Sequence, residues 1–555
     1  MKKYILLFVL PLYIQCSSPT QEPIQAAVVS ARIEASEAGK TVMMQGGNAY
    51  DAMVATSFAL TVVYPVAGNI TGGGFFVYRT AEGETGSLDY REMAPLTATK
   101  DLYLDENGAV IPKLSTVGGL AVGIPGAVAG ILEVHEKMGS LPLAQLLAPA
   151  IKLAEEGYIV TEKQARSFKR YRDLFVEVNG AETFFAQDHK AGDRIVNLPL
   201  AKTLKAIAEK GAAGFYEGWV AEAMVKKTQA TGGILSLEDL KAYEPKWRDP
   251  VEFTYKDLNV ISMAPPSSGG ICLGQMMQMV APYDLKSMGH NTAKSMHLMI
   301  EAERRSYADR SHFLGDPDFV TVPQAHLIDP AYTQERMQDY SEEKATRSID
   351  VSHGDIIVVE SDETTHFSIV DKDGNAVSVT TTLNGAYGSK VFVDEIGVFM
   401  NNEMDDFSSK PGVPNMFGLT GSEANAIAPK KRMLSSMTPS IVEKEDQLYM
   451  VVGTPGGSTI ITSVFQTILN VYEHGMEMQE AVAAPRFHHQ WLPDIVVLEP
   501  DSFNEEVVKD LQDKGHVIET KYSRIIGKVD AILVDETGRI SVGADPRGDD
   551  AAASF

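Results

Sequence analysis

Residues 363–377 read ETTHFSIVDKDGNAV, and this stretch decides the fold. Apolar and polar side chains alternate from Thr364 to Val370, a polar run containing Gly374 follows, and the alternation resumes over residues 376–383. Period-two alternation is typical of β-strands, and a short polar run with glycine is typical of the turn between them. The sequence therefore predicts a β-hairpin whose first strand begins at Thr364.

The segment before this hairpin has a different composition. Residues 341–363 are rich in Asp and Glu and contain only Lys344 and Arg347 as basic residues, which predicts a solvated, mobile connector. If the bond between Glu363 and Thr364 is cut, Thr364 gains a free α-amine beside its own hydroxyl. The reference pKa of an α-amine is ~7.7–8.0, so its neutral form can accept the hydroxyl proton as a general base. The local pattern alone still favours ordinary strand threonines, because Thr is common in β-strands.

A helix is predicted before the glycine cluster at residues 72–74, a strand after it, and further helices later in the chain. A buried helix is predicted over residues 49–63 and a strand over 75–78. Residues 52–78 have no charged side chain, and their Pro, Asn and Gly residues suit a protein core better than a bilayer. Apolar residues at intervals of three and four predict further helices over residues 143–156, 201–210 and 292–309.

Other motifs accompany this threonine. Downstream lie TTTLN (380–384), NNEMDDF (401–407), LSSMTP (434–439) and GTPGGS (453–458). Upstream lie GNAYDA (47–52), NITGGGF (69–75), YREMAP (90–95), PPSSGG (265–270) and YADR (307–310). In this order, and together with residues 364–377, they resemble the gamma-glutamyltranspeptidase family from about residue 26 to the C-terminus.

The resemblance implies an architecture and a maturation step. It implies an α/β (α+β) N-terminal-nucleophile hydrolase fold, a four-layer αββα sandwich with two central β-sheets between helical layers. The family makes one precursor that cuts itself, so here the Thr364 hydroxyl would attack the Glu363 carbonyl. The products would be a large subunit of residues 17–363 and a small catalytic subunit of residues 364–555, which stay interleaved in one core.

The resemblance also implies how a γ-glutamyl donor is held. An α-carboxylate suits a guanidinium and hydroxyl donors, and an α-ammonium suits oxygen acceptors. The residues matched to the carboxylate are Arg91, Ser435 and Ser436, and those matched to the ammonium are Asn384, Glu403 and Asp406. Without the family, Arg91 would be interpreted as a surface ion pair with Glu92, and Asp406 as a solvated acid.

The catalytic roles follow the same resemblance. Backbone N–H groups at Gly456 and Gly457 would stabilise the oxyanion, and Thr382 would hydrogen-bond Thr364. The γ-glutamyl-threonine ester would then pass to water or to an amino acid or peptide amine, with glutathione as the implied donor. No cofactor and no metal is expected, and His488 and His489 are interpreted as structural because no spaced ligand set accompanies them.

Two positions depart from the family pattern. Phe417 lies in a segment that resembles the lid of many bacterial members, where tyrosine is common at this position. Phenylalanine cannot donate a hydroxyl hydrogen bond to Asn384, so we expect a looser lid and a different ratio of hydrolysis to transfer. Thr71 replaces a glycine of the glycine cluster, and the sequence alone does not indicate what this replacement does.

The composition excludes one class of partner. The chain has 555 residues, 44% of them hydrophobic, and a formal net charge of −25. These values describe a folded globular protein. Nucleic acid is not expected as a partner, because no run of Lys and Arg exceeds residues 430–432.

The N-terminal residues predict export. Two lysines precede an apolar run over residues 4–14, a pattern typical of a secretory signal, here residues 1–16. Cys16, the last residue of this segment, resembles the lipidated residue of a bacterial lipoprotein, although Gln15 replaces the usual small residue. An ordinary signal with an incidental cysteine is the alternative. Cys272 is the only other cysteine, so no intrachain disulfide is expected after processing. We expect a periplasmic protein or a lipoprotein tethered to a membrane through Cys16.

Two other functions remain open at this stage. A cephalosporin or glutaryl acylase shares the fold and the nucleophile chemistry, but Arg91 together with Glu403 and Asp406 favours an amino-acid head group. An uncleaved, non-enzymatic surface binding protein would require damaged catalytic positions, and all those that can be mapped are intact.

Overall fold

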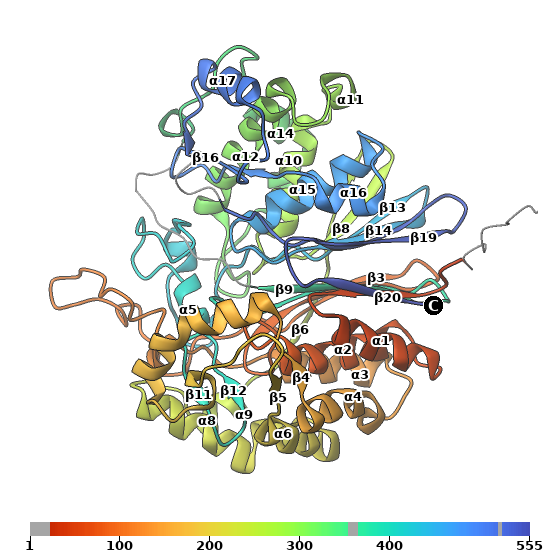
Figure 1. The fold of residues 1–555 in the computed structure, drawn as a ribbon. Coiled ribbons are helices and arrows are strands. Elements are labelled where there is room, and N and C mark those ends of the chain that lie inside the picture. Colours follow the sequence, from red (N-terminus) through yellow and green to blue (C-terminus); the bar gives the residue numbers. More distant parts are fainter. Residues whose placement is uncertain (1–22, 353–363, 520–523) are drawn as a thin grey trace, which may run out of the picture.

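The protein is a sandwich of two β-sheets between two layers of helices (Figure 1). The computed structural model describes residues 23–352, 364–519 and 524–555. In order across the first sheet, the strands are β20 (Ala551–Ser554), β1 (Ala27–Ser30), β9 (Thr365–Val370), β10 (Ala376–Thr382), β2 (Gly73–Arg79), β3 (Thr85–Asp89) and β6 (Lys246–Arg248). In order across the second sheet, they are β19 (Ile540–Ala544), β18 (Asp530–Val534), β14 (Gln447–Gly453), β13 (Ser440–Lys444), β8 (Leu258–Ser262) and β7 (Val251–Tyr255). The four-layer αββα architecture is therefore confirmed.

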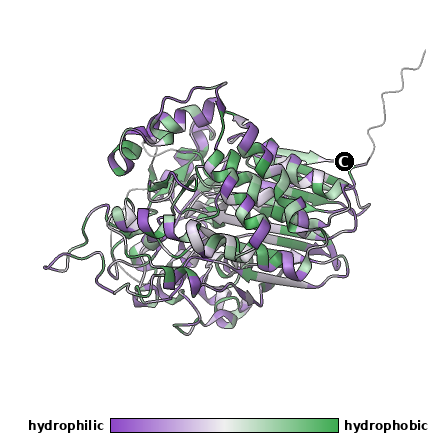
Figure 2. Cartoon of the chain, turned by 90° about the horizontal axis from the view of Figure 1, so that it is seen from below, coloured by the Kyte–Doolittle hydropathy of each residue, from purple (hydrophilic) through white to green (hydrophobic). Residues whose placement is uncertain are grey.

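Helices cover the outer face of each sheet (Figure 1). Those on the side of the first sheet are α1 (Ile33–Met44), α2 (Ala49–Val63), α3 (Ala127–Met138), α4 (Leu143–Glu156), α5 (Glu162–Asn179), α6 (Leu198–Lys210) and α8 (Gly218–Ala230). Those on the side of the second sheet are α10 (Gly269–Val280), α12 (Ala293–Phe313), α14 (Pro330–Arg336), α15 (Thr459–Tyr472), α16 (Met478–Ala483) and α17 (Glu505–Asp513). In Figure 2 the hydrophobic colour concentrates along the central strands and the hydrophilic colour on loops and outward helix faces. Within the described residues, the helices are all too short or too polar to cross a bilayer.

The predicted hairpin lies at the centre of the first sheet. β9 and β10 pair antiparallel, with Thr381 opposite Thr365 and Ala376 opposite Val370, so the hairpin prediction is confirmed. Its neighbour α2 spans the predicted residues 49–63 and begins with a capping box in which Asn48 and Asp51 exchange side-chain and backbone hydrogen bonds. The GNAYDA motif therefore starts the helix that packs on the hairpin.

The polar face of β9 is buried between the two sheets. Phe367 and Ile369 pack toward the helical side of the sheet, in one cluster with residues of α2. On the other face, the His366 ring bonds Thr380 (Nδ1 to Oγ1, 2.9 Å) and the Ser368 hydroxyl donates to the carbonyl of Asp530 at 3.0 Å. Burial lowers the pKa of His366 to about 3, so this histidine is neutral. The alternation thus marks two buried faces with different chemistry, and neither faces solvent.

Each sheet contains strands from both sides of residue 364. β1 lies between β20 and β9, while β7 and β8 of the second sheet extend the row formed by β13, β14, β18 and β19. A cut before Thr364 would leave every one of these backbone ladders intact. The two pieces would therefore share one core.

The structure differs from the sequence prediction in the first part of the acidic connector. Ser348 and Val351 are buried, and the indole N–H of Trp491 donates to both of their carbonyls at 3.0 and 3.2 Å. Asp494 also accepts from the Ser348 backbone N–H at 2.7 Å. These contacts hold residues 341–352 on the protein surface, with Ala345, Ser348 and Val351 buried and the charged side chains exposed. Residues 353–363, including Glu363, lie outside the described residues.

Candidate active site

One pocket collects most of the residues that the sequence analysis singled out. It lies at the end of the hairpin, beside Thr364, which is 4% exposed. The predicted residues that line it are Arg91, Thr364, Thr382, Asn384, Glu403, Asp406, Phe417, Ser435, Ser436 and Gly457. Gly456 precedes Gly457 in the same turn, whereas Glu363 and Cys16 lie outside the described part of the chain. Segments far apart in the sequence thus meet at the predicted nucleophile.

Thr382 and Asn384 are positioned by the end of β10. The Asn384 backbone N–H donates to the Thr382 hydroxyl oxygen at 2.7 Å. Asn384 has a φ of 74°, a conformation that asparagine tolerates better than most residues. Its side-chain amide nitrogen donates to the carbonyl of Asn402 at 3.0 Å. Because the amide nitrogen is used in this contact, the amide oxygen of Asn384 is left to accept a hydrogen bond from a ligand.

Arg91 is the centre of a buried ion cluster. Its guanidinium pairs with both Glu403 and Asp406, lies 3.6 Å from a carboxylate oxygen of Glu92, and donates to the carbonyls of Met433 and Leu434 at 3.3 Å. Arg91 is 1% exposed. The alternative of a surface pair with Glu92 is therefore wrong, as is a solvated Asp406.

The acids of this cluster cannot all be charged. Burial raises the pKa of Glu92 to about 7, against the attraction of Arg91, and burial also raises the pKa of Glu403 and of Asp406. Both carboxylate oxygens of Glu92 and one of Glu403 are buried without a donor among the described residues. Two adjacent carboxyl groups without a donor between them are stable only if they hold a proton. Near neutral pH the cluster therefore keeps one proton on the Glu92 and Glu403 pair.

The two serines offer hydroxyl protons to the pocket. Ser435 Oγ accepts from the Met437 backbone N–H at 3.1 Å, and Ser436 Oγ accepts from the Arg310 guanidinium at 3.1 Å. Within residues 23–352, 364–519 and 524–555, neither hydroxyl donates to a protein acceptor. Both protons are free for a bound carboxylate.

Arg310 is a pocket residue to which the sequence analysis gave no role. It lies near the end of α12, is 4% exposed and lines the pocket. The YADR motif was the available signal, but its fourth residue could not be linked to Ser436 without the fold. Only the packing of α12 against residues 435–436 places this second arginine beside the first.

The glycine pair forms the turn that leads into α15. Gly456 has a φ of 138° and Gly457 a φ of 54°, conformations that side chains other than glycine rarely adopt. The Thr459 backbone N–H donates to the Gly456 carbonyl at 3.0 Å, which begins the helix. The turn and the N-terminus of α15 therefore place backbone N–H groups beside the pocket, as an oxyanion site requires.

The segment around Phe417 closes the pocket without a tyrosine hydroxyl. Phe417 is 4% exposed, and its carbonyl accepts from the Gln490 side chain at 3.3 Å. The preceding residues are fixed by Asn415, which donates to Asp406 at 3.0 Å, and by the Met416 backbone N–H, which donates to Asp405 at 2.9 Å. Contacts of the lid backbone and of Asn415 thus hold it shut here.

Thr71 has a structural explanation. Its side chain is fully buried, and its hydroxyl donates to the carbonyl of Phe399. Its own carbonyl accepts from the Asn401 side chain at 2.7 Å. Threonine in place of glycine therefore adds a hydrogen bond and leaves no buried hydroxyl unpaired.

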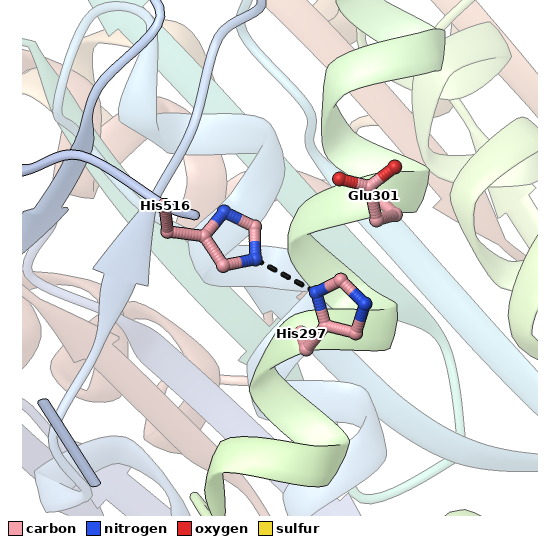
Figure 3. Close-up of side chains that lie close together, drawn as sticks. All are labelled: His297, Glu301 and His516. Carbon is pink, nitrogen blue, oxygen red and sulfur yellow. Dashed lines mark hydrogen bonds between the residues drawn. The ribbon is translucent and has the colours of Figure 1, made fainter. Parts of the chain in front are cut away.

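The histidines form buried hydrogen-bonded networks away from this pocket. His297, Glu301 and His516 lie together, with 2.7 Å between the two histidine rings (Figure 3). Glu301 already pairs with Arg304 and Arg305, and the second ring nitrogen of His297 bonds the carbonyl of Ser341 at 2.8 Å. This spacing fits a direct hydrogen bond better than two nitrogens on one metal ion, which lie farther apart.

The neighbouring His488 and His489 are structural in the same sense. His488 bonds Thr462 and Gln490 at 2.9 and 2.8 Å, and burial lowers its pKa to about 3. His489 bonds Asp494 at 3.3 Å and accepts from the Trp491 backbone N–H at 3.1 Å. Their ring nitrogens are occupied by protein partners.

Comparison with known proteins decides the family. Residues 35–555 match the model of the gamma-glutamyltranspeptidase family. The chain belongs to this family. A glutathione hydrolase proenzyme of Escherichia coli strain K12 is 43% identical over 536 residues, which cover 96% of this chain and 92% of that protein.

Solved structures agree with this gamma-glutamyltranspeptidase assignment. The gamma-glutamyltranspeptidase of Helicobacter pylori matches with 44% identity and a TM-score of 0.58, covering 60% of this chain and 97% of that one. A cephalosporin acylase from Bacillus halodurans matches over 99% of both chains with a TM-score of 0.84, but at 26% identity. The acylase thus shares the whole architecture, while the transpeptidase shares more of the sequence.

Proposed function

We propose that this gamma-glutamyltranspeptidase family member cleaves the γ-glutamyl amide bond of glutathione and of related γ-glutamyl compounds. The observation that carries the proposal is the position of Thr364 in a pocket that also contains Arg91, Glu403 and Asp406. A buried cation beside two carboxyl groups matches a head group with one carboxylate and one ammonium. The sequence relatives named glutathione hydrolase support the same donor.

The head group would exchange ion pairs with the protein. In the structure, Arg91 pairs with both Glu403 and Asp406. A donor places its ammonium against Glu403, Asp406 and the Asn384 amide oxygen, and its carboxylate against Arg91 and the serine hydroxyls. Each buried charge keeps a partner throughout, which avoids the large cost of an isolated buried ion.

The chemistry then uses the two functional groups of one residue. After cleavage before Thr364, its neutral α-amine accepts the hydroxyl proton while the oxygen attacks the γ-carbonyl carbon. Negative charge develops on the carbonyl oxygen, which faces the Gly456 and Gly457 backbone N–H groups. The C–N bond breaks, the leaving amine takes the proton from the Thr364 ammonium, and a γ-glutamyl-threonine ester remains. Water or the amine of an amino acid or peptide then attacks the ester and restores the enzyme.

Maturation is part of the proposal. The Thr364 hydroxyl attacks the Glu363 carbonyl, the peptide bond is replaced by an ester, and hydrolysis leaves a large subunit that ends at Glu363 and a small subunit of residues 364–555. The interleaved strand order supports a cut that does not separate the pieces. The name proenzyme, given to the relative from E. coli, supports it as well.

Export belongs to the proposal on sequence grounds. Residues 1–16 lie outside the described residues, and their basic and apolar pattern supports a signal peptide. We place the mature protein in the periplasm or on a membrane through lipidated Cys16. Globomycin treatment of expressing cells, followed by mass spectrometry of the N-terminal peptide, separates the two locations.

A donor comparison tests the activity. The purified protein should split on a denaturing gel, release a fragment beginning at Thr364, and hydrolyse γ-L-glutamyl-p-nitroanilide. A glutaryl anilide is the matched donor for an acylase, since it keeps the terminal carboxylate but lacks the α-ammonium. Faster cleavage of the glutaryl anilide would reject the proposal in favour of an acylase, and a stable single chain would favour a binding protein.

A further inference from the structure

Arg310 is the second buried arginine of the pocket, and its surroundings differ from those of Arg91. Arg91 bonds two carboxyl groups and two backbone carbonyls, so its donors are directed at protein acceptors. Arg310 has no carboxylate within 4.0 Å in the described part of the chain. A buried guanidinium keeps its charge, so Arg310 contributes a positive field that no carboxylate in contact with it cancels.

The contacts of Arg310 fix the two serines of the pocket. Its Nε donates to the Ser268 hydroxyl at 2.9 Å, and one terminal nitrogen donates to the Ser436 hydroxyl at 3.1 Å. Ser268 in turn donates to the carbonyl of Ser435 at 2.6 Å. One planar guanidinium therefore holds both neighbouring serines, directly at Ser436 and through Ser268 at Ser435.

This arrangement determines where a hydroxyl proton points. Ser436 Oγ accepts from Arg310, so its own proton must point away from the guanidinium. Ser436 faces the pocket, and its proton has no protein acceptor among the described residues. A bound carboxylate would accept a hydrogen bond from this hydroxyl and would be attracted by the Arg310 guanidinium, which has no carboxylate in contact with it.

We propose that Arg310 is a positioning residue for the α-carboxylate of the donor, acting by orienting the Ser436 hydroxyl and by holding Ser435 through Ser268. This inference rests on the proposed function, because it assumes a γ-glutamyl donor. It also assigns a role to the PPSSGG and YADR motifs, which come together at the contact between Ser268 and Arg310. Burial lowers the pKa of Arg310, in agreement with a cation whose balancing carboxylate comes from the ligand.

The test compares two donors that differ only in the carboxylate. One is γ-L-glutamyl-p-nitroanilide, and the other is the same compound with its α-carboxylate converted to a carboxamide. Arg310→Lys keeps a positive charge but loses the planar guanidinium whose nitrogens donate to Ser268 and Ser436 at the same time. We expect it to raise KM for the carboxylate donor about tenfold with kcat changed less than about threefold. For the carboxamide donor, kcat/KM should change less than about twofold.

A double-mutant cycle with Ser436→Ala tests the route. If Arg310 acts through Ser436, Arg310→Lys should cost less than about threefold in the Ser436→Ala background, because the shared interaction is already lost. Arg79→Lys is the matched control, since Arg79 is buried and ion-paired with Glu443 away from the pocket. It should leave KM for both donors unchanged.

Several outcomes would overturn the inference. Equal losses for the two donors, or additive effects in the cycle, would make Arg310 a structural residue only. If Arg310→Lys is not cleaved before Thr364, Ser268→Ala replaces it in the donor comparison, and equal losses there have the same meaning. Failure of the matured wild type on γ-L-glutamyl-p-nitroanilide would instead reject the proposed function.

Discussion

The ring of Phe417 lies against Gly457, where a Cβ would come within 2.5 Å of the aromatic carbons. The proposed lid and the proposed oxyanion turn are therefore in direct contact, and the absence of a side chain at Gly457 allows this contact. The φ of 54° at the same residue adds a second reason for glycine.

Gly457→Ala should lower kcat/KM by about 10- to 100-fold, because it adds strain of ~1–3 kcal/mol and pushes the lid away. Phe417→Ala in the same chain should restore part of the loss, since it removes the atoms that clash. Steady-state kinetics on γ-L-glutamyl-p-nitroanilide measure both variants. No recovery in the double variant would place the whole effect in the backbone turn.

Thr364→Ala should remain a single chain without activity, because it lacks the hydroxyl for both cleavage and catalysis. The neighbouring threonine offers a matched control. Thr365 is fully buried with its hydroxyl unpaired among the described residues, so Thr365→Val should mature normally and be at least as stable. Denaturing mass spectrometry over several days reads out both, and a cleaved Thr364→Ala chain would disprove the assigned nucleophile.

The buried acid cluster predicts a dependence of stability on pH. Burial raises the folded-state pKa of Glu92 to about 7, above its usual 4.5. The folded state therefore holds the proton more tightly than the unfolded state, and this contribution, present below pH 4.5, is lost as the pH rises toward 7.

Between pH 5 and pH 8, the free energy of unfolding of Glu92→Gln should fall less than that of the wild type, by an amount on the order of 1 kcal/mol. Melting temperatures measured across this pH range report the difference. Glu37→Gln, on the surface of α1, is the control and should follow the wild type. If the melting temperatures of wild type and Glu92→Gln change with pH in the same way, Glu92 and Glu403 do not share a proton.

The lid predicts a change in the fate of the acyl-enzyme. In Phe417→Tyr, the new hydroxyl could donate to the Asn384 amide oxygen, which the Asn402 contact leaves available. We expect the ratio of transfer to hydrolysis with a dipeptide acceptor to rise severalfold, because a latched lid restricts the entry of water. Phe417→Leu, which removes the ring but adds no hydroxyl, should not raise it. Equal ratios for wild type and Phe417→Tyr would remove the idea of a looser lid.

Much of the fold could be predicted from local sequence. The alternation over residues 364–383 specified the hairpin, because side chains of a strand alternate between two faces. The limits of α2 followed from an apolar run that begins after Asn48, where the cap lies. The candidate site could be predicted through the motifs, since most of the matched residues line one pocket.

Other features required the three-dimensional structure. The polar face of β9 could not be assigned to the protein interior, because the partners of His366 and Ser368 lie on two other strands, Thr380 on β10 and Asp530 on β18. The packed part of the acidic connector was also not predictable, since its anchor Trp491 is more than a hundred residues away. The local composition of a segment indicates how readily it is solvated, but it does not reveal which distant residues pack against it.

The sequence by itself determined the hairpin and the family motifs, and it supplied the proposed nucleophile, because each of these depends on contiguous residues. Only the tertiary structure decided how the charges are paired. Arg91 and Glu403 are separated by 312 positions, and Arg310 and Ser436 by 126, yet each pair is in direct contact. The electrostatics of a buried site depend on distances between atoms, and these distances are set by how the two sheets and the helices on them pack.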